Sequence, residues 1–178
     1  MHITHITGLM RVFVLALLSL FAVPVIAFAE STYSQSYFGL ILRSAHTATD
    51  ALNDNTPGLT FGLRTQRVRG YETFWEAGVF YNSYEEVSPI LLLGASAPVW
   101  RPSENLEVRL AASIGTAYYG ELSESLEQTY GIPNIGGFIP MAALSVWLRT
   151  GETDIRLTSV PAERDVGAVL NLSVAIPF

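Results

Sequence analysis

The sequence of 178 residues has no cysteine and no lysine, and its ten basic residues are all arginine. The absence of cysteine excludes a disulfide scaffold and a thiol nucleophile. Sixteen acidic residues give a formal net charge of −6, which argues against a nucleic-acid partner because such a partner requires a basic face. The chain is therefore neither a disulfide-rich module nor a nucleic-acid-binding domain.

Beyond its N-terminus, the chain also lacks any apolar run near the ~18 residues that a transmembrane helix needs. The N-terminus itself has a positive charge, an apolar run over residues 12–26, and small residues at Ala27 and Ala29. This pattern is typical of a signal peptide, so we predict export and cleavage after Ala29. Residues 1–29 would be removed, and residues 30–178 would form a single domain.

Apolar and polar residues alternate along much of the remaining chain, and the last segment, VGAVLNLSVAIPF, is the clearest case. One row is apolar and the other is small or polar, as in a barrel strand with lipid on one side and the lumen on the other. The apolar row consists of Ala168, Leu170, Leu172, Val174, Ile176 and Phe178. A final phenylalanine is typical of outer-membrane barrels, so we expect Phe178 to engage the barrel-assembly machinery.

Eight segments of this kind can be counted: 36–45, 58–66, 74–82, 90–98, 106–116, 139–149, 154–160 and 166–178. No sheet edge survives in hydrocarbon, so the strands must close, and eight is the smallest common number. We therefore predict an all-β protein, a monomeric eight-stranded antiparallel transmembrane β-barrel of the outer membrane. A soluble lipocalin-like barrel uses the same alternation, but with a more polar outer row and no need for the terminal phenylalanine.

If both termini are periplasmic, the connections alternate between two ends. The periplasmic turns would be 67–73, 99–105 and 150–153, and the outer segments would be 46–57, 83–89, 117–138 and 161–165. Near the outer end, the stretches YFGLIL, ILLLGA and IPMAALSVWL are apolar on both faces, which predicts an apolar outer half of the lumen. Such a lumen either fills with side chains, as small barrels commonly do, or holds an acyl chain.

Four prolines lie where an outer segment meets a strand: Pro57, Pro89, Pro140 and Pro161. Proline cannot donate a hydrogen bond to the strand ladder. These prolines either simply end strands or open gaps in the barrel wall through which a lipid tail enters. We predict the second, with the prolines contacting the lipid substrate.

One histidine, His46, lies outside the signal segment, and the predicted topology brings it to the same rim as Asn82, Ser83 and Tyr84. A histidine beside a serine hydroxyl is the minimum for acyl transfer, with Tyr84 expected to contact the substrate. Alternatively, His46 and the Asn-Ser pair are solvated loop residues. With one histidine, no cysteine and no glycine-rich phosphate-binding loop, we predict neither a metal nor another cofactor.

In their order and spacing, several segments resemble the PagP-type lipid A palmitoyltransferases of Gram-negative outer membranes. They are ILRSAHT, NDNTPGLTFGL, FYNSYEEVSPILLLG, VWRP, the IP at 139–140, and RLTSVPAERDVGAVLNLSVAIPF. The resemblance implies an eight-stranded barrel that moves palmitate from the sn-1 position of a phospholipid to a hydroxyl on an acyl chain of lipid A.

The resemblance also implies roles for individual residues. The family has an essential histidine in its first loop and an essential aspartate-serine pair after its third strand, matched by His46 and by Asn82-Ser83. Gly94 matches the small residue at the pocket floor that measures acyl-chain length. The prolines that flank the family's lateral gaps are matched by Pro57, Pro140 and Pro161.

Three departures from the family pattern stand out. Asn82 cannot hold the charge of the family's aspartate and retains only hydrogen bonding. Only ESTYSQS precedes the first strand, so we expect no amphipathic helix there, and the third outer loop has no basic residue. Two other functions stay open, a lipid A deacylase barrel and a non-enzymatic structural or adhesive barrel.

Overall fold

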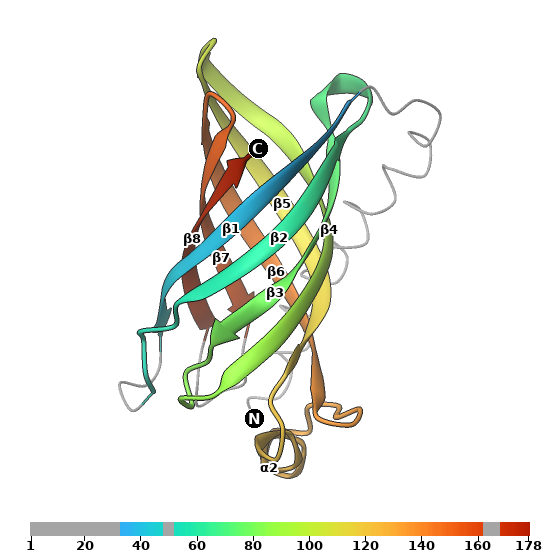
Figure 1. Cartoon of the computed structure of the whole chain (residues 1–178), viewed down its shortest axis with the longest axis vertical. Coiled ribbons are helices and arrows are strands. Elements are labelled where there is room, and N and C mark those ends of the chain that lie inside the picture. Colours follow the sequence, from blue (N-terminus) through green and yellow to red (C-terminus); the bar gives the residue numbers. More distant parts are fainter. Residues whose placement is uncertain (1–32, 48–51, 162–167) are drawn as a thin grey trace, which may run out of the picture.

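A computed structural model describes residues 33–47, 52–161 and 168–178 (Figure 1). The predicted signal peptide lies outside the described residues. Eight strands run in chain order: β1 (Tyr33–His46), β2 (Gly58–Gln66), β3 (Glu72–Tyr81), β4 (Val87–Ser103), β5 (Leu106–Tyr118), β6 (Phe138–Thr150), β7 (Thr153–Pro161) and β8 (Ala168–Pro177). A short 3₁₀ helix, η2 (Val68–Gly70), lies in the β2–β3 turn, and one helix, α2 (Leu122–Tyr130), lies between β5 and β6.

Each strand pairs antiparallel with its neighbours in the chain, and β1 also pairs with β8, so the sheet closes on itself. The predicted eight-stranded antiparallel barrel is confirmed. Every predicted strand coincides with an observed one, with bounds that differ by a few residues. The alternation of apolar and polar residues was sufficient to predict the strands. Side chains of a strand point alternately to its two faces, and these faces have different surroundings in a membrane barrel.

Three details differ from the sequence prediction. Strand β4 continues to Ser103, so the segment 99–105 is mostly strand and not a turn. His46 is the last residue of β1 and not a loop residue. The segment 117–138 contains helix α2, whose short sequence LSESLEQTY has too few apolar residues to reveal a helical period.

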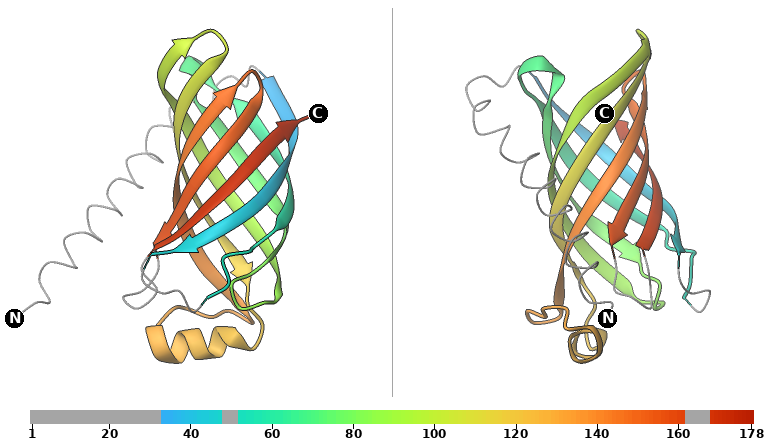
Figure 2. Two further views of the ribbon diagram at one scale, coloured as in Figure 1. Left: turned by 90° about the vertical axis from the view of Figure 1, so that its left-hand side faces the viewer. Right: turned by 180° about the vertical axis from the view of Figure 1, so that it is seen from behind.

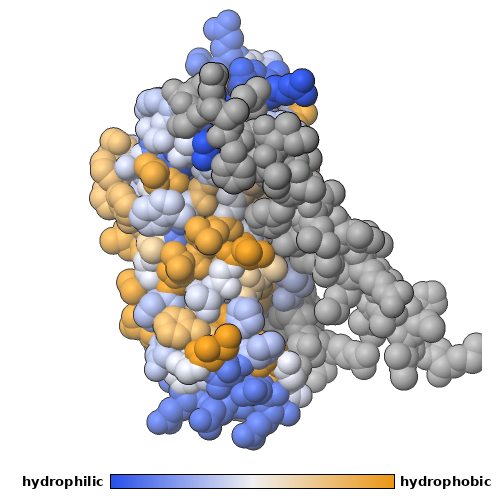
Figure 3. Space-filling view, turned by 90° about the vertical axis from the view of Figure 1, so that its right-hand side faces the viewer, coloured by the Kyte–Doolittle hydropathy of each residue, from blue (hydrophilic) through white to orange (hydrophobic). Residues whose placement is uncertain are grey.

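The exterior of the barrel is apolar around its middle, as Figure 3 shows between two hydrophilic ends of the molecule. Large apolar side chains point outward from all eight strands, and many are at least 39% exposed, including Leu40, Phe61, Val79, Leu93, Leu110, Val146, Leu157 and Ile176. This is the surface that hydrocarbon requires of a spanning barrel. No helix in the described part of the chain has the length and hydropathy needed to cross a membrane.

The C-terminal Phe178 belongs to an aromatic cluster on this exterior. Its ring stacks on Phe38 with the centroids 4.4 Å apart, and its backbone N–H donates to the Ser36 carbonyl. Phe61 lies within aromatic contact distance of both rings and also of Trp75. The folded barrel therefore seals its final seam, β1 against β8, with aromatic packing on the outside.

Ion pairs fill the half of the interior at the end predicted to face the periplasm, called the periplasmic half below. Arg149 lies 2.6 Å from both Glu72 and Asp154, and Arg64 lies 2.7 Å from Asp154. Arg109 pairs with Glu107 and donates to Ser96. These side chains are buried or nearly so, and each charge has a partner, which is the condition under which buried charges are tolerated.

The ion-paired side chains of this half are together called the ion-pair plug. Arg156 lies at its inner boundary, toward the middle of the barrel. Its guanidinium donates to Glu76 at 2.8 Å and lies over the rings of Trp147 and Tyr37, at 4.1 and 4.8 Å from their centroids. The Nε and Nη2 atoms of Arg156 have no hydrogen-bond acceptor among the described residues. The attraction between the cation and the two ring faces offsets this loss.

The opposite end of the barrel carries the longer connections and α2, which lies across the opening (Figure 2). Glycines with positive φ flank the helix: Gly120, Gly131, Gly136 and Gly137. Gly131 ends α2 in the left-handed conformation, with its N–H donating to the Glu127 carbonyl. This end corresponds to the predicted outer rim.

Candidate active site at the outer rim

Three side chains at the outer rim form a continuous hydrogen-bonded chain. Ser83 Oγ lies 3.0 Å from His46 Nε2, and His46 Nδ1 lies 3.0 Å from Asp54 Oδ1. The His46 side chain is only 2% exposed, whereas Asp54 is 36% exposed. With the ring proton on Nδ1, Asp54 holds the tautomer that leaves Nε2 free to accept the Ser83 proton.

Backbone hydrogen bonds hold these three residues together across two connections. The Ser44 N–H donates to the Asp54 carbonyl at 2.9 Å, and the Asn53 N–H donates to the Ser83 carbonyl at 3.1 Å. Ser44 Oγ also bonds to Thr56 Oγ1 at 2.8 Å, and both side chains are buried. The loop that carries Asp54 is therefore fixed both to β1 and to the turn that carries Ser83.

Sequence reasoning missed Asp54. The segment LNDNTP contains it among other turn residues, and nothing in its spacing from His46 marks it as a partner. In the fold, the hydrogen bond with His46 lowers the pKa of Asp54 below its usual range, and Arg43 lowers it further. Asp54 is thus an anion at neutral pH, suited to orient the imidazole and to stabilise its protonated form.

Asn82, also predicted as a site residue, bonds within its own turn and to Ser88 and is not a member of this hydrogen-bonded chain. It is fully buried, and its Oδ1 accepts hydrogen bonds from the backbone N–H groups of Tyr84 and Glu86. Its Nδ2 donates to Ser88 Oγ at 2.9 Å, and Ser88 in turn donates to the Tyr118 carbonyl at 2.6 Å. Asn82 therefore shapes the turn that presents Ser83 and ties this turn to β5.

The remaining rim residue predicted from sequence, Tyr84, follows Ser83 directly. Its ring makes an edge-to-face contact with Tyr119, with centroids 6.2 Å apart. Burial, with the neighbouring Tyr84 contributing, raises the pKa of Tyr119 to about 12, so this phenol stays neutral. Tyr84 thus links the Ser83 turn to the connection that carries α2.

Below the rim, the inward side chains of the outer half are largely apolar. Ile90, Leu92, Met141, Val160 and Val169 are partly exposed, whereas the charged inward residues of the periplasmic half are buried. Polar side chains such as Thr60, Ser88 and Asn171 share this inward row, so the prediction of an apolar outer half is met only in part. In the described part of the chain, the ion pairs of this half are Arg43–Asp54 and His46–Asp54, and they lie at the rim.

Gly94 faces the lumen at the boundary between the two halves. A Cβ at this position would overlap the ring of Phe74, its partner on β3, and the carbonyl oxygen of Ala112. Phe74 packs in turn on Trp147, with centroids 5.1 Å apart, and the Arg156 guanidinium lies over the Trp147 ring. Gly94 therefore lies at the inner end of the apolar half.

One seam of the barrel wall is open near the outer end. The β6–β7 ladder stops at the pair Leu144–Ser159, so residues 138–143 have no partner on β7. Pro140 lies in this unpaired stretch, and Pro161 ends β7 on its other side. Both prolines thus lie where the sequence predicts a lateral gap.

The other two prolines have different surroundings. The β1–β2 ladder stops at Ile41–Gly58, directly after Pro57, but the hydrogen bonds from Ser44 to the Asp54 loop bridge this seam. Pro89 lies inside a continuous β3–β4 ladder, paired with Val79. On its other side the β4–β5 ladder stops at the pair Ile90–Ala117, directly after Pro89, but the hydrogen bond from Ser88 Oγ to the Tyr118 carbonyl bridges this seam. Pro89 thus lies where a ladder ends, as Pro57 does.

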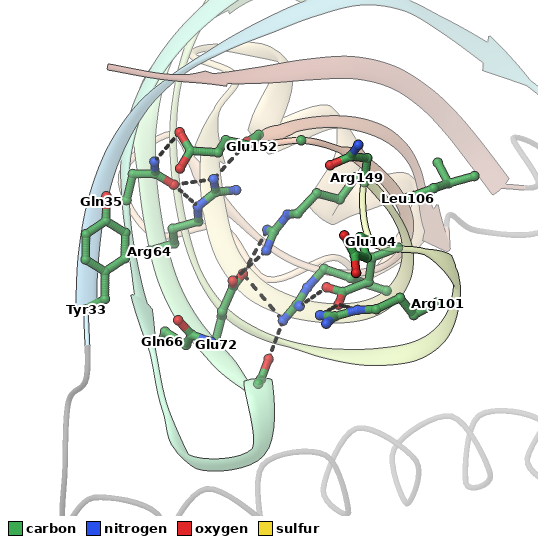
Figure 4. Close-up of a pocket in the computed structure, with 15 residues that line it drawn as sticks. Tyr33, Gln35, Arg64, Gln66, Glu72, Arg101, Glu104, Leu106, Arg149 and Glu152 are labelled. Atoms are coloured by element: carbon green, nitrogen blue, oxygen red, sulfur yellow. Dashed lines mark hydrogen bonds and ion pairs between the residues drawn. The ribbon is translucent and has the colours of Figure 1, made fainter.

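The periplasmic mouth holds a polar cavity of about 200 Å³ (Figure 4). Arginine and glutamate side chains line it. Arg109 donates to Glu107 and Arg149 donates to Glu72, while Arg64 donates to the backbone carbonyl of Glu152. Among the described residues, no group of three or more His, Cys, Asp or Glu side chains is arranged to hold a metal ion. The cavity belongs to the plug and lies far along the barrel from Ser83.

The chain matches no protein-family model and no curated protein sequence. It is similar to the N-terminal β-barrel domain of Pseudomonas aeruginosa OprF, with 14% identity over 82% of this chain and 100% of that one, at a TM-score of 0.48. It is also similar to a designed transmembrane β-barrel, with 14% identity over 84% of this chain and 100% of that one, at a TM-score of 0.44. The strand pairing of the chain itself defines the eight-stranded barrel.

Proposed function

We propose that this protein is an outer-membrane acyltransferase that moves a palmitoyl chain from a phospholipid donor to lipid A in the outer leaflet. The observation that carries the proposal is the Asp54–His46–Ser83 chain at the mouth of an apolar half-lumen. The resemblance of the segments around His46, Ser83 and Gly94 to PagP-type enzymes supports the choice of substrates. No cofactor is needed, because the reaction only exchanges an acyl group and moves protons.

The first half-reaction begins with the donor ester at Ser83. Ser83 Oγ attacks the carbonyl carbon while its proton moves to His46 Nε2, and Asp54 stabilises the imidazolium that forms. The tetrahedral intermediate then expels the lysophospholipid alkoxide, which takes the proton from His46. The products are a lysophospholipid and an acyl ester on Ser83.

The second half-reaction returns the enzyme to its starting state. A lipid A hydroxyl gives its proton to His46 Nε2 as its oxygen attacks the acyl-Ser83 carbonyl. Ser83 Oγ leaves and regains a proton from His46. Water in place of the lipid hydroxyl would give hydrolysis, so the low exposure of His46 favours transfer over hydrolysis.

The outer half of the barrel supplies a route and a place for the acyl chain. The open β6–β7 seam beside Pro140 would admit a lipid tail sideways from the membrane. The apolar inward residues would then surround it, and each buried methylene contributes ~0.8 kcal/mol. The buried Glu76–Arg156 ion pair and the Phe74 ring lie at the inner end of this half, so the chain would end near Gly94.

The test is the mass of lipid A from a Gram-negative host that lacks its own palmitoyltransferase. Expression of the full chain should add one palmitoyl group, and Ser83→Ala or His46→Ala should abolish the addition. Ser34→Ala is the matched control, because Ser34 is an exposed serine at the periplasmic end of β1. A loss of an acyl group would instead indicate the deacylase, and unchanged lipid A with folded protein would indicate a non-enzymatic barrel.

A further inference from the structure

Arg43 has an unusual position for a charged residue on this barrel. It pairs with Leu172 on β8, and directly paired residues point to the same face of a sheet, so Arg43 lies on the outward face. Leu172 is 41% exposed on that face, and the Arg43 side chain is 70% exposed. Arg43 is therefore a membrane-facing cation on the outer part of β1.

The distribution of charge makes this cation distinctive. The other arginines that the structure describes lie in the periplasmic half or its turns: Arg64, Arg67, Arg69, Arg101, Arg109, Arg149 and Arg156. The exposed charged residues of the connections at the outer end are acidic, namely Glu85, Glu86, Glu121, Glu124 and Glu127. Within the described ranges, an anion that approaches the outer rim from the membrane meets a cation at Arg43.

Arg43 also touches the candidate active site. Its Nη2 lies 3.5 Å from Asp54 Oδ2, while the other oxygen of Asp54 accepts the hydrogen bond from His46. An exposed pair at this distance contributes at most ~1 kcal/mol. The guanidinium has five N–H donors in a planar fork, so most of its hydrogen-bonding capacity stays available for a bidentate partner such as a phosphate.

We propose that Arg43 binds the phosphate of a lipid substrate and so brings the reacting group of that lipid to Ser83. The proposal rests on the acyl-transfer function given above and names the part of the substrate that this site recognises. A phosphate at Arg43 would lie at headgroup level on the outside of β1, beside the loop that carries Asp54. Its source is either the donor phospholipid or the acceptor lipid A, since both carry phosphate in the same leaflet.

Steady-state kinetics in detergent micelles test this with the full barrel. One arm compares phosphatidic acid with diacylglycerol as donor, and the other compares bisphosphorylated with monophosphorylated lipid A as acceptor. Arg43→Gln should raise KM for the phosphate-bearing lipid about tenfold, as expected for one charged hydrogen bond, with kcat within about twofold. Arg43→Lys should restore part of the affinity. If Arg43→Gln raises KM in the donor arm, the phosphate belongs to the phospholipid, and if it raises KM in the acceptor arm, the phosphate belongs to lipid A.

The matched control is Arg101→Gln, since Arg101 is similarly exposed, at 67%, but lies at the periplasmic end.

A direct binding measurement separates this proposal from the catalytic one. In the Ser83→Ala background, native mass spectrometry should show about tenfold weaker retention of phosphatidic acid or lipid A after Arg43→Gln, with diacylglycerol unchanged. Equal effects of Arg43→Gln on lipids with and without phosphate would overturn the proposal and leave Arg43 only a support for Asp54.

Discussion

The two halves of the barrel interior differ in nearly every property that matters for stability and chemistry. The periplasmic half is held by buried ion pairs around Arg149 and Asp154, and the β5–β6 and β6–β7 ladders continue to its turns. The outer half has apolar inward residues, a stretch of β6 without a partner on β7, and a hydrogen-bonded Ser-His-Asp chain at its rim. We infer that the plug supplies the cohesion that lets the other half keep an open seam and the candidate site.

The first prediction concerns the outer half and has the largest expected effect. Asp54→Asn should lower the acyl-transfer rate by roughly 10²–10⁴-fold, because an amide neither fixes the His46 tautomer nor stabilises the imidazolium. Lipid A mass spectrometry and the heat-dependent gel migration of the barrel measure activity and folding on the same sample. A folded Asp54→Asn variant with normal transfer would remove Asp54 from the mechanism.

The pH dependence of acyl transfer should follow from the same Asp54 carboxylate. The hydrogen bond with His46 lowers the pKa of Asp54 in the folded protein, so the interaction is fully present above the ordinary aspartate range. It should be lost only as the pH falls through that lowered pKa. The acid limb of a kcat profile for the native protein, compared with Asp54→Asn, checks this direction.

The second prediction concerns the periplasmic half. Asp154→Asn removes one partner from a buried cluster in which Arg64 and Arg149 both contact the carboxylate. The free energy of unfolding should fall by ~3–5 kcal/mol, because in a buried site Arg64 loses its carboxylate partner, and Arg149 and Arg156 each lose one of two. Urea unfolding in micelles measures this, while the transfer rate per folded molecule should stay unchanged.

Glu104→Gln is the control for the Asp154 variant, since Glu104 is an exposed carboxylate at the same end. Its unfolding free energy should stay within about 0.5 kcal/mol of the native value. If Asp154→Asn lowered the rate per folded molecule as strongly as the stability, the two halves would not be separate functional regions.

The third prediction concerns Asn82 and the turn between β3 and β4. Ser88 uses its proton for the Tyr118 carbonyl, so it must accept a hydrogen bond from residue 82. An aspartate there cannot donate, and Asn82→Asp should cost ~1–3 kcal/mol of stability, with a comparable loss of transfer as the Ser83 turn shifts. Higher activity for Asn82→Asp would instead show that a charge at this position assists His46.

The smallest expected effect lies at the boundary between the halves. Gly94→Met would place a side chain where Phe74 now packs, and should shorten the apolar half by a few methylenes, each contributing ~0.8 kcal/mol of burial. The preferred donor chain should become shorter. Chromatography of the fatty acids transferred to lipid A measures this, and an unchanged chain length would locate the chain terminus elsewhere.

Much of the fold was predictable from sequence because the relevant signals are local. Alternation in segments such as residues 106–116 identifies a strand and assigns its faces without knowledge of any partner. The prediction that His46 and Ser83 share a rim needed only the count of strands, since connections in an antiparallel barrel alternate between two ends. The Pro140 and Pro161 positions are local signals of the same kind.

The sequence by itself determined the eight strands, their inward and outward rows, and the pairing of a histidine with a serine at one end. Only the tertiary structure decided that Asp54 completes the chain, that Asn82 faces Ser88 instead of His46, and that a hydrogen bond from Ser88 bridges the seam beside Pro89. The physical reason is that these contacts depend on loop conformation and on the register between strands. A residue's own neighbours in the chain do not specify either one, since many loops and registers satisfy the same alternation.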